Sequence, residues 1–298
     1  MGALLALTTA IAWAISPVCF ASAGRKIGSF PVTLLRCGGA AILLLAVLPI
    51  YGMLVAIAPP SLMQVIYLAA SGFFGMVIGD ILLFEAFVLI GPRRTTQTVV
   101  LAPIPAILIG WFYLNETLSL QTLTGIALAL AGTFYAVLRR PDVEAAHEPM
   151  RISPMGLLMA IGGSICVGIG GVAARAAYQE REGLDPVLAT TIRVNASAVM
   201  LWLVPIVLGK APKLIGHLRD TYVLSRVGLG TLIGPFGGML TYLWAFKLAK
   251  AGPTATLASM SPLFILPILA IRYHTRVPID VIVAAIVACT GVAMIFLR

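Results

Sequence analysis

Four ionisable side chains lie inside long apolar stretches of the sequence and are the groups best able to do chemistry there: Arg36, Asp80, Glu85 and Arg193. A charge at the centre of a membrane-spanning helix costs about 2.5–3.5 kcal/mol on insertion scales, so each should face another charge, water or the headgroups. Asp80 lies deepest, and its carboxylate could recognise an amino group or carry a proton. The two arginines lie early in their stretches, where they could snorkel to the headgroups or form a structural ion pair.

Asp80 shares one helical stripe with residues that an amphipathic solute could contact. At helical spacing the stripe contains Phe73, Met76, Phe84 and Phe87. The stripe could line a solute pathway, or it could be ordinary apolar packing. The predicted substrate pathway, drawn from this stripe and from other stretches, consists of Trp13, Ser16, Met76, Gly79, Asp80, Phe84, Gln97, Pro235, Met239, Tyr242 and Ser259. Hydroxyl groups in membrane helices often donate to their own backbone, so the serines also have a structural interpretation.

The polar residues do not form a catalytic or metal-binding pattern. The four cysteines lie in separate apolar stretches without CxxC or Cys/His spacing, which is typical of small packing side chains. The three histidines are scattered over loops, and a Walker A pattern for ATP binding is absent from the sequence. We therefore predict that the protein is not an enzyme and needs neither a metal nor a cofactor. A membrane enzyme acting on lipid-linked substrates and a passive channel remain as alternatives.

The elements that hold these side chains must be membrane helices. Of the 298 residues, 60% are hydrophobic and only 10% are charged, against roughly 45–50% and 25% in a soluble domain. Bilayer hydrocarbon offers no water to the backbone, so such stretches fold as helices. At about 20 residues for each span, the chain has room for roughly ten. The predicted spans are residues 3–23, 30–50, 62–90, 93–114, 118–138, 153–174, 185–208, 223–248, 252–272 and 278–297.

An internal repeat divides these spans into two halves. A Gly-xxx-Gly motif at residues 75–79 recurs at residues 234–238, and the same offset maps Pro103 to Pro262. A unit of about five spans is odd, so the second unit must enter the membrane from the opposite side. Inverted repeats of this kind place a substrate site near the midplane, where the repeats meet. The predicted units are residues 1–140 and 153–298, with a cytoplasmic linker at residues 141–152.

The third and eighth spans, residues 62–90 and 223–248, are too long for a straight crossing of a hydrocarbon core of about 30 Å. Both are rich in glycine at matching places. A tilted helix would explain the length, but the matched glycines favour broken or bent helices, which point to a binding site. The glycines could equally serve close packing of helices. The span at residues 223–248 contains no acidic residue at the place that matches Asp80. The two repeats are therefore expected to share their structure but not this charged group.

The net charge of +9 does not predict nucleic-acid binding, because the basic residues sit singly or in pairs at the ends of spans. Most of them lie on the loops after spans one, three, five, seven and nine. The positive-inside rule makes those loops cytoplasmic. We therefore predict a multi-pass protein in the lipid bilayer of a bacterial inner membrane, with both termini on the periplasmic side.

The segment from Pro103 to Gly132 resembles the closing signature of the EamA repeat in the drug/metabolite transporter superfamily, with its proline-bearing helix followed by Glu116 and Gly125. Residues 274–276 depart from that signature at the place that matches Glu116, so we expect Glu116 to be a structural cap of the first half only. The resemblance implies ten helices around a central cavity and export of small metabolites, for instance amino acids with aromatic side chains. Other members of the superfamily move drugs, sugars or nucleotide sugars. We expect a small-molecule substrate and a functional monomer, and we leave open whether protons are the coupling ion.

Overall fold

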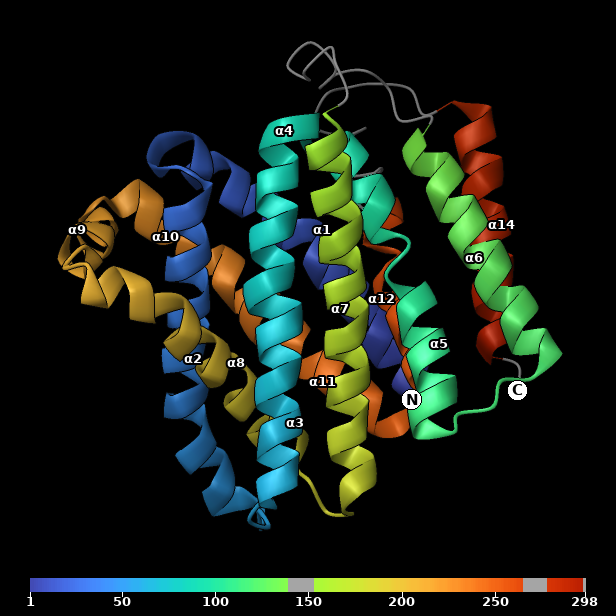
Figure 1. Cartoon of the computed structure of the whole chain (residues 1–298), viewed down its shortest axis with the longest axis horizontal. Coiled ribbons are helices and arrows are strands. Elements are labelled where there is room, and N and C mark those ends of the chain that lie inside the picture. The colour runs from blue at the N-terminus through green and yellow to red at the C-terminus, as the bar shows by residue number, and fades with distance from the viewer. Residues whose placement is uncertain (139–152, 265–277, 297–298) are drawn as a thin grey trace.

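Long apolar helices make up both halves of the chain (Figure 1). The computed structural model describes residues 1–138, 153–264 and 278–296, and the regular structure of these residues is helical. The first half contains α1 (Gly2–Ile27), α2 (Ser29–Leu54), α3 (Leu62–Gly72), the π-helix η1 (Phe73–Ile78), α4 (Gly79–Val99), α5 (Pro103–Leu114) and α6 (Leu120–Leu138). The second half contains α7 (Pro154–Glu180), α8 (Pro186–Val207), α9 (Ala211–Gly216), the 3-10 helix η3 (His217–Arg219), α10 (Thr221–Thr231), the π-helix η4 (Leu232–Gly238), α11 (Met239–Leu248), α12 (Ala251–Ala258) and α14 (Ile279–Phe296).

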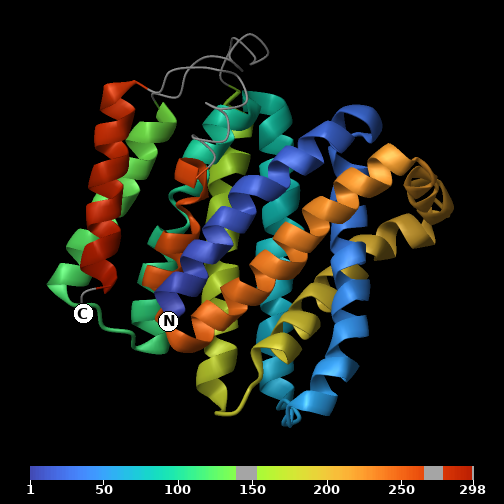
Figure 2. The ribbon, with the colours of Figure 1, turned by 180° about the vertical axis from the view of Figure 1, so that it is seen from behind.

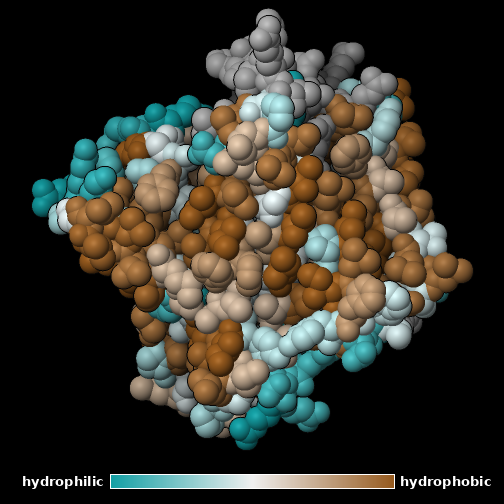
Figure 3. All heavy atoms as spheres, viewed as in Figure 1, coloured by the Kyte–Doolittle hydropathy of each residue, from teal (hydrophilic) through white to brown (hydrophobic). Residues whose placement is uncertain are grey.

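Eight helices in the described parts of the chain are long and apolar enough to cross a membrane, and α5 is a shorter apolar helix. Large apolar side chains face outward; Phe112 and Val199, for example, are 74% and 67% exposed. The face in Figure 3 is hydrophobic across its middle, and hydrophilic residues gather toward its ends. A surface of this kind suits lipid, which confirms the prediction of an all-α membrane protein.

The two halves cross the molecule in opposite directions. In Figures 1 and 2, α1 begins at the end where both termini lie and runs toward the other end, whereas α7 begins at that other end and runs back. The halves are also interleaved, because α1 packs against α10 and α11 while α7 packs against α3 and α4. The first helix of each half therefore lies against the third span of the other half, and the prediction of inverted repeats is confirmed.

Two predicted spans are shorter or differently divided in the structure, and proline explains both. The predicted span 93–114 is split, because α4 runs on to Val99 and α5 begins at Pro103. Proline has no N–H to donate to the carbonyl four residues earlier, so the helix ends at that residue. In the predicted span 252–272, α12 ends at Ala258, four residues before Pro262. Residues 265–272 of that span lie outside the described residues.

Candidate functional site

Both long spans are interrupted by π-helix where their sequences predicted a break. The π-helices η1 and η4 continue directly into α4 and α11, with no change to an extended backbone on either side. A π-helical turn inside an α-helix is rare and is frequent at functional sites. The breaks are therefore confirmed, and they take the form of a widened turn and not an unwound segment.

The glycines of η4 make room for side chains of α1. A Cβ built on Gly238 would lie 3.0 Å from Nε1 of Trp13. A Cβ on Gly234 would clash with the side chain of Ser16, which is 2.7 Å away at its own Cβ. Close helix packing through glycine therefore places both predicted pathway residues of α1 against η4.

The same arrangement recurs in the other half, between η1 and α7. A Cβ on Gly79 would lie 3.3 Å from Cγ2 of Val167, and a Cβ on Gly75 would lie 3.6 Å from the Cα of Gly170. The predicted pathway residue Gly79 thus contacts a neighbouring helix directly. These glycine contacts lie where the two halves of the chain meet, because η1 and α4 of the first half pack against α7 of the second.

Tyr242 of α11 is the middle of an aromatic group at this centre. Its ring centroid lies 4.8 Å from that of Trp13 and 4.6 Å from that of Phe246. Met76 and Met239 are buried in the same apolar core. The structure therefore brings four predicted pathway residues together from both halves of the chain: Trp13, Met76, Met239 and Tyr242.

Asp80 forms an ion pair with Arg36 of α2. The Arg36 guanidinium also lies over two aromatic rings, with Cζ 5.5 Å from the ring centroid of Phe84 and 5.6 Å from that of Phe20. The two charged side chains are 18% and 23% exposed, so the pair is largely withdrawn from solvent. Of the interpretations that the sequence left open for Arg36, the structure selects the ion pair.

Arg193 of α8 belongs to this centre, although the sequence prediction did not include it in the pathway. The residue is 3% exposed, and its Cζ lies 5.6 Å from the ring centroid of Tyr242. Within the described residues, its Nε and Nη1 atoms have no hydrogen-bond partner. The signal that could have identified it is its position, because Arg36 and Arg193 occupy corresponding places in the second helices of the two repeats.

The remaining predicted pathway residues are placed as follows. Pro235 is buried inside η4. Ser259 is buried too, and its hydroxyl donates to the carbonyl of Thr256 at 2.8 Å, so it bonds its own chain. Gln97 lies in α4, but its side chain is outside the described ones.

A second polar group lies near the end of the molecule that carries both termini. Glu116 accepts hydrogen bonds from Arg175 Nε and from the backbone N–H of Ala251, both at 2.8 Å. Arg175 also donates to the carbonyl of Phe246 at 2.8 Å. Glu116 is therefore a cap, but the helix it caps is α12, in the second half of the chain.

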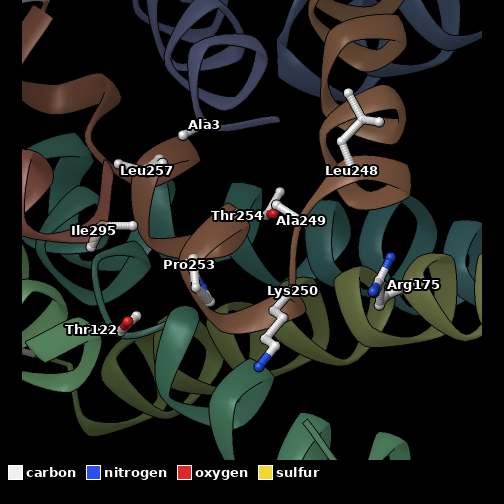
Figure 4. Close-up of a pocket in the computed structure, with 10 residues that line it drawn as sticks. All are labelled: Ala3, Thr122, Arg175, Leu248, Ala249, Lys250, Pro253, Thr254, Leu257 and Ile295. Carbon is white, nitrogen blue, oxygen red and sulfur yellow. The ribbon is translucent and has the colours of Figure 1, made fainter. Parts of the chain in front are cut away.

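A cavity of about 370 Å³ lies beside this group, with Arg175 and Lys250 among its lining residues (Figure 4). Its other lining residues come from α12 and the turn before it, and from α1, α6, α11 and α14. In the part of the chain that the structure describes, no three His, Cys, Asp or Glu residues could hold a metal ion. The group around Arg193 and Tyr242 and the group around Glu116 and Arg175 thus both place charged, hydrogen-bonding side chains among apolar ones.

Comparison with known proteins identifies the family. No curated protein matches this chain. A protein of known crystal structure has the same fold with a TM-score of 0.74 and 19% sequence identity, over 99% of this chain and 96% of its own. The sequence model of the EamA-like transporter family matches residues 1–138 and again residues 154–297. Since the two matches together span nearly the whole chain, the protein belongs to the EamA-like transporter family.

Proposed function

We propose that this membrane transporter exports amino acids with aromatic or other apolar side chains from the cytoplasm by alternating access. The observation that carries the proposal is the position of the buried Arg193 beside Tyr242, where the two repeats meet. The Arg36–Asp80 ion pair adds charged groups inside the first repeat. Inverted-repeat transporters bind their solutes at such an interface. Family membership supports transport of small molecules; the choice of amino acids is our proposal.

The chemistry of the centre matches a solute with a charged end and an apolar end. The rings of Trp13 and Tyr242 offer an apolar surface, and the charged groups offer partners for an amino or carboxyl group. The aromatic group would also suit an apolar drug, so export of drugs or other metabolites is the second candidate. A panel of solutes separates the two.

Several features support a hinged motion between the repeats. The π-helices and the helix ends before Pro103 and Pro262 interrupt regular backbone hydrogen bonding inside the membrane. They occur at equivalent places in both halves. Such interruptions are where a helix can bend without breaking further hydrogen bonds.

We further propose that the protein acts as a monomer in the inner membrane, with the loop at α9 in the cytoplasm. Arg25 and Lys26 end α1 on the same side as α9, opposite both termini (Figures 1 and 2). Lys213 lies on α9 itself. The positive-inside rule then assigns the termini to the periplasm.

Counterflow in proteoliposomes tests the proposed function. Vesicles containing the purified protein are loaded with an unlabelled solute, and entry of the labelled solute is followed for an amino-acid panel and a drug panel. We expect apolar and aromatic amino acids to accelerate entry of their labelled forms. A passive channel would show no such acceleration, and an enzyme would change the solute chemically. Acceleration by drugs alone would contradict the amino-acid proposal.

A further inference from the structure

The two repeats place an arginine at equivalent points, but only one of these arginines has an acid beside it. Arg36 is the eighth residue of α2, and Arg193 is the eighth residue of α8. Asp80 follows Gly79 in the first half, and the residue that follows the equivalent glycine, Gly238, is Met239. At the position equivalent to that of Asp80, the second repeat therefore has a neutral thioether on α11, a helix that packs against α8.

Arg193 is a buried cation, and most of its hydrogen-bonding capacity is unused within the described residues. Its Nε and Nη1 atoms carry three of the five guanidinium N–H groups, and these atoms are buried without a partner among the described residues. Asp80 acts on Arg193 electrostatically, but its ion pair is with Arg36. The three charges therefore sum to one uncompensated positive charge. A buried charge without a hydrogen-bonded partner is unfavourable, so the site is suited to an anion that arrives from outside.

The guanidinium of Arg193 lies where both repeats meet. Its Nη2 atom is 2.9 Å from the position that a Cβ on Gly75 of η1 would occupy, so the absence of a side chain there makes room for it. Gly170 of α7 lies against the same point of η1, and Tyr242 of α11 lies beneath the guanidinium. The cation is therefore enclosed by elements of both halves and stands next to the aromatic group.

We infer that Arg193 binds the carboxylate of the transported solute, so that the substrates are monocarboxylates whose apolar part packs against Tyr242 and Trp13. This inference rests on the proposed function, because it assumes that the solute-binding site lies between the two repeats. The planar guanidinium matches a carboxylate in geometry and remains charged at every physiological pH. The bound carboxylate group would balance the single positive charge that remains on Arg36, Asp80 and Arg193 together.

Three matched probes test the inference through the thermal stability of the purified protein: L-phenylalanine, 3-phenylpropionate, which lacks the amine, and phenethylamine, which lacks the carboxylate. We expect the first two to stabilise the wild type and phenethylamine not to do so. In Arg193→Met, binding of both carboxylates should weaken by at least about thirtyfold. Arg193→Lys should restore part of the loss. The control Arg226→Met removes an exposed arginine of α10 and should change nothing.

A second variant tests the same idea without removing Arg193. Met239→Asp gives the second repeat the acid that Asp80 provides in the first, and it places this carboxylate on α11, which packs against the helix of Arg193. We expect Met239→Asp to weaken binding of 3-phenylpropionate strongly, whereas the matched variant Met239→Asn should weaken it much less. Equal effects of the two variants would contradict a role for charge at Arg193.

The outcomes separate this inference from the proposed function. If labelled phenylalanine shows counterflow but Arg193→Met binds both carboxylates as the wild type does, the inference fails and the function stands. If phenylalanine shows no counterflow but 3-phenylpropionate still stabilises the wild type through Arg193, the amino-acid function fails and the inference stands. The inference is overturned if phenethylamine stabilises the wild type as much as 3-phenylpropionate does. It is also overturned if neither carboxylate stabilises the wild type.

Discussion

The carboxylate of Asp80 and the guanidinium of Arg36 form an ion pair that joins α4 to α2 within the first repeat. The Arg36 guanidinium also lies over the rings of Phe20 and Phe84, so the arginine has partners besides Asp80. A proton that binds Asp80 must compete with Arg36 for the same carboxylate. A proton-coupled mechanism through Asp80 would therefore have to break the ion pair between Asp80 and Arg36.

If Asp80 carries a coupling proton, Asp80→Asn abolishes the dependence of solute uptake into liposomes on a pH gradient, because an amide cannot exchange the proton. The measurement is uptake at equal and at opposed pH across the vesicle wall. The variant should also be less stable by about 1–3 kcal/mol, since Arg36 loses its charged partner. The double variant Arg36→Met with Asp80→Met controls for that loss. Unchanged pH-gradient dependence in Asp80→Asn would remove Asp80 from proton coupling.

Gly170 should tolerate no side chain, because η1 passes directly over it. A Cβ at Gly170 would lie 2.8 Å from the Cα of Gly75 and 2.9 Å from its nitrogen, and these are backbone atoms that cannot rotate away. We predict that Gly170→Ala destabilises the protein by about 1–3 kcal/mol and slows transport. Gly228→Ala is the matched control, since a Cβ there has nothing within 4 Å; it should be neutral or stabilising by up to about 1 kcal/mol.

Glu116 should be more important to stability than its position in a loop suggests. We predict that Glu116→Ala costs about 3 kcal/mol, because it leaves Arg175 and the N–H of Ala251 without their acceptor. Glu116→Gln should cost less, since its amide oxygen can still accept from Ala251. Thermal unfolding in detergent compares the two variants. A larger loss in Glu116→Gln than in Glu116→Ala would contradict the capping role.

A pair outside the membrane provides a pH-dependent contact between α1 and α10. The hydrogen bond from Lys26 holds the pKa of the Asp220 carboxyl below its ordinary value of 3.8, and the N–H groups of Val223 and Tyr222 act in the same direction. Because the folded pKa is lowered, this stabilisation is present above the ordinary pKa and is lost as the pH falls through the lowered one. We predict that Lys26→Met raises the pKa of Asp220, as measured by NMR titration. An unchanged pKa would show that the pair does not form.

Cysteine labelling tests the proposed orientation. Glu182 lies between α7 and α8, on the side of both termini, and Lys213 lies on α9 at the opposite side. Both are exposed. We predict that Glu182→Cys reacts with an impermeant maleimide in spheroplasts, whereas Lys213→Cys reacts only after the membrane is opened. The reverse pattern would place the termini in the cytoplasm.

Features with a local cause were predictable from the sequence. Apolar length predicted the helices, and the glycine motifs predicted the two interruptions, because both depend on residues close together in the chain. The division of the span at 93–114 was missed, although Pro103 gives its physical cause. Proline inside an apolar stretch can either kink a helix or end it, and the choice depends on neighbouring helices.

Features that depend on distant partners could not be predicted in the same way. The role of Glu116 as a cap was expected, but its partner Ala251 lies far along the chain, in the other repeat. From the sequence, Arg193 was expected either to snorkel to the headgroups or to form a structural ion pair. Its missing counter-ion became visible once the structure paired Asp80 with Arg36 and placed Tyr242 beside Arg193.

Met239 at the place equivalent to Asp80 has a consequence for how the transporter behaves at its two faces. In an inverted-repeat transporter the two end states differ by an exchange of conformation between the repeats. Chemically identical repeats would therefore bind a solute equally well from either side. The acid in one repeat and the thioether in the other remove that equality, so the two faces should saturate at different solute concentrations. A difference in solute affinity between the two faces cannot by itself concentrate the solute on one side of the membrane, because affinity changes only how much of each conformational state is occupied by solute.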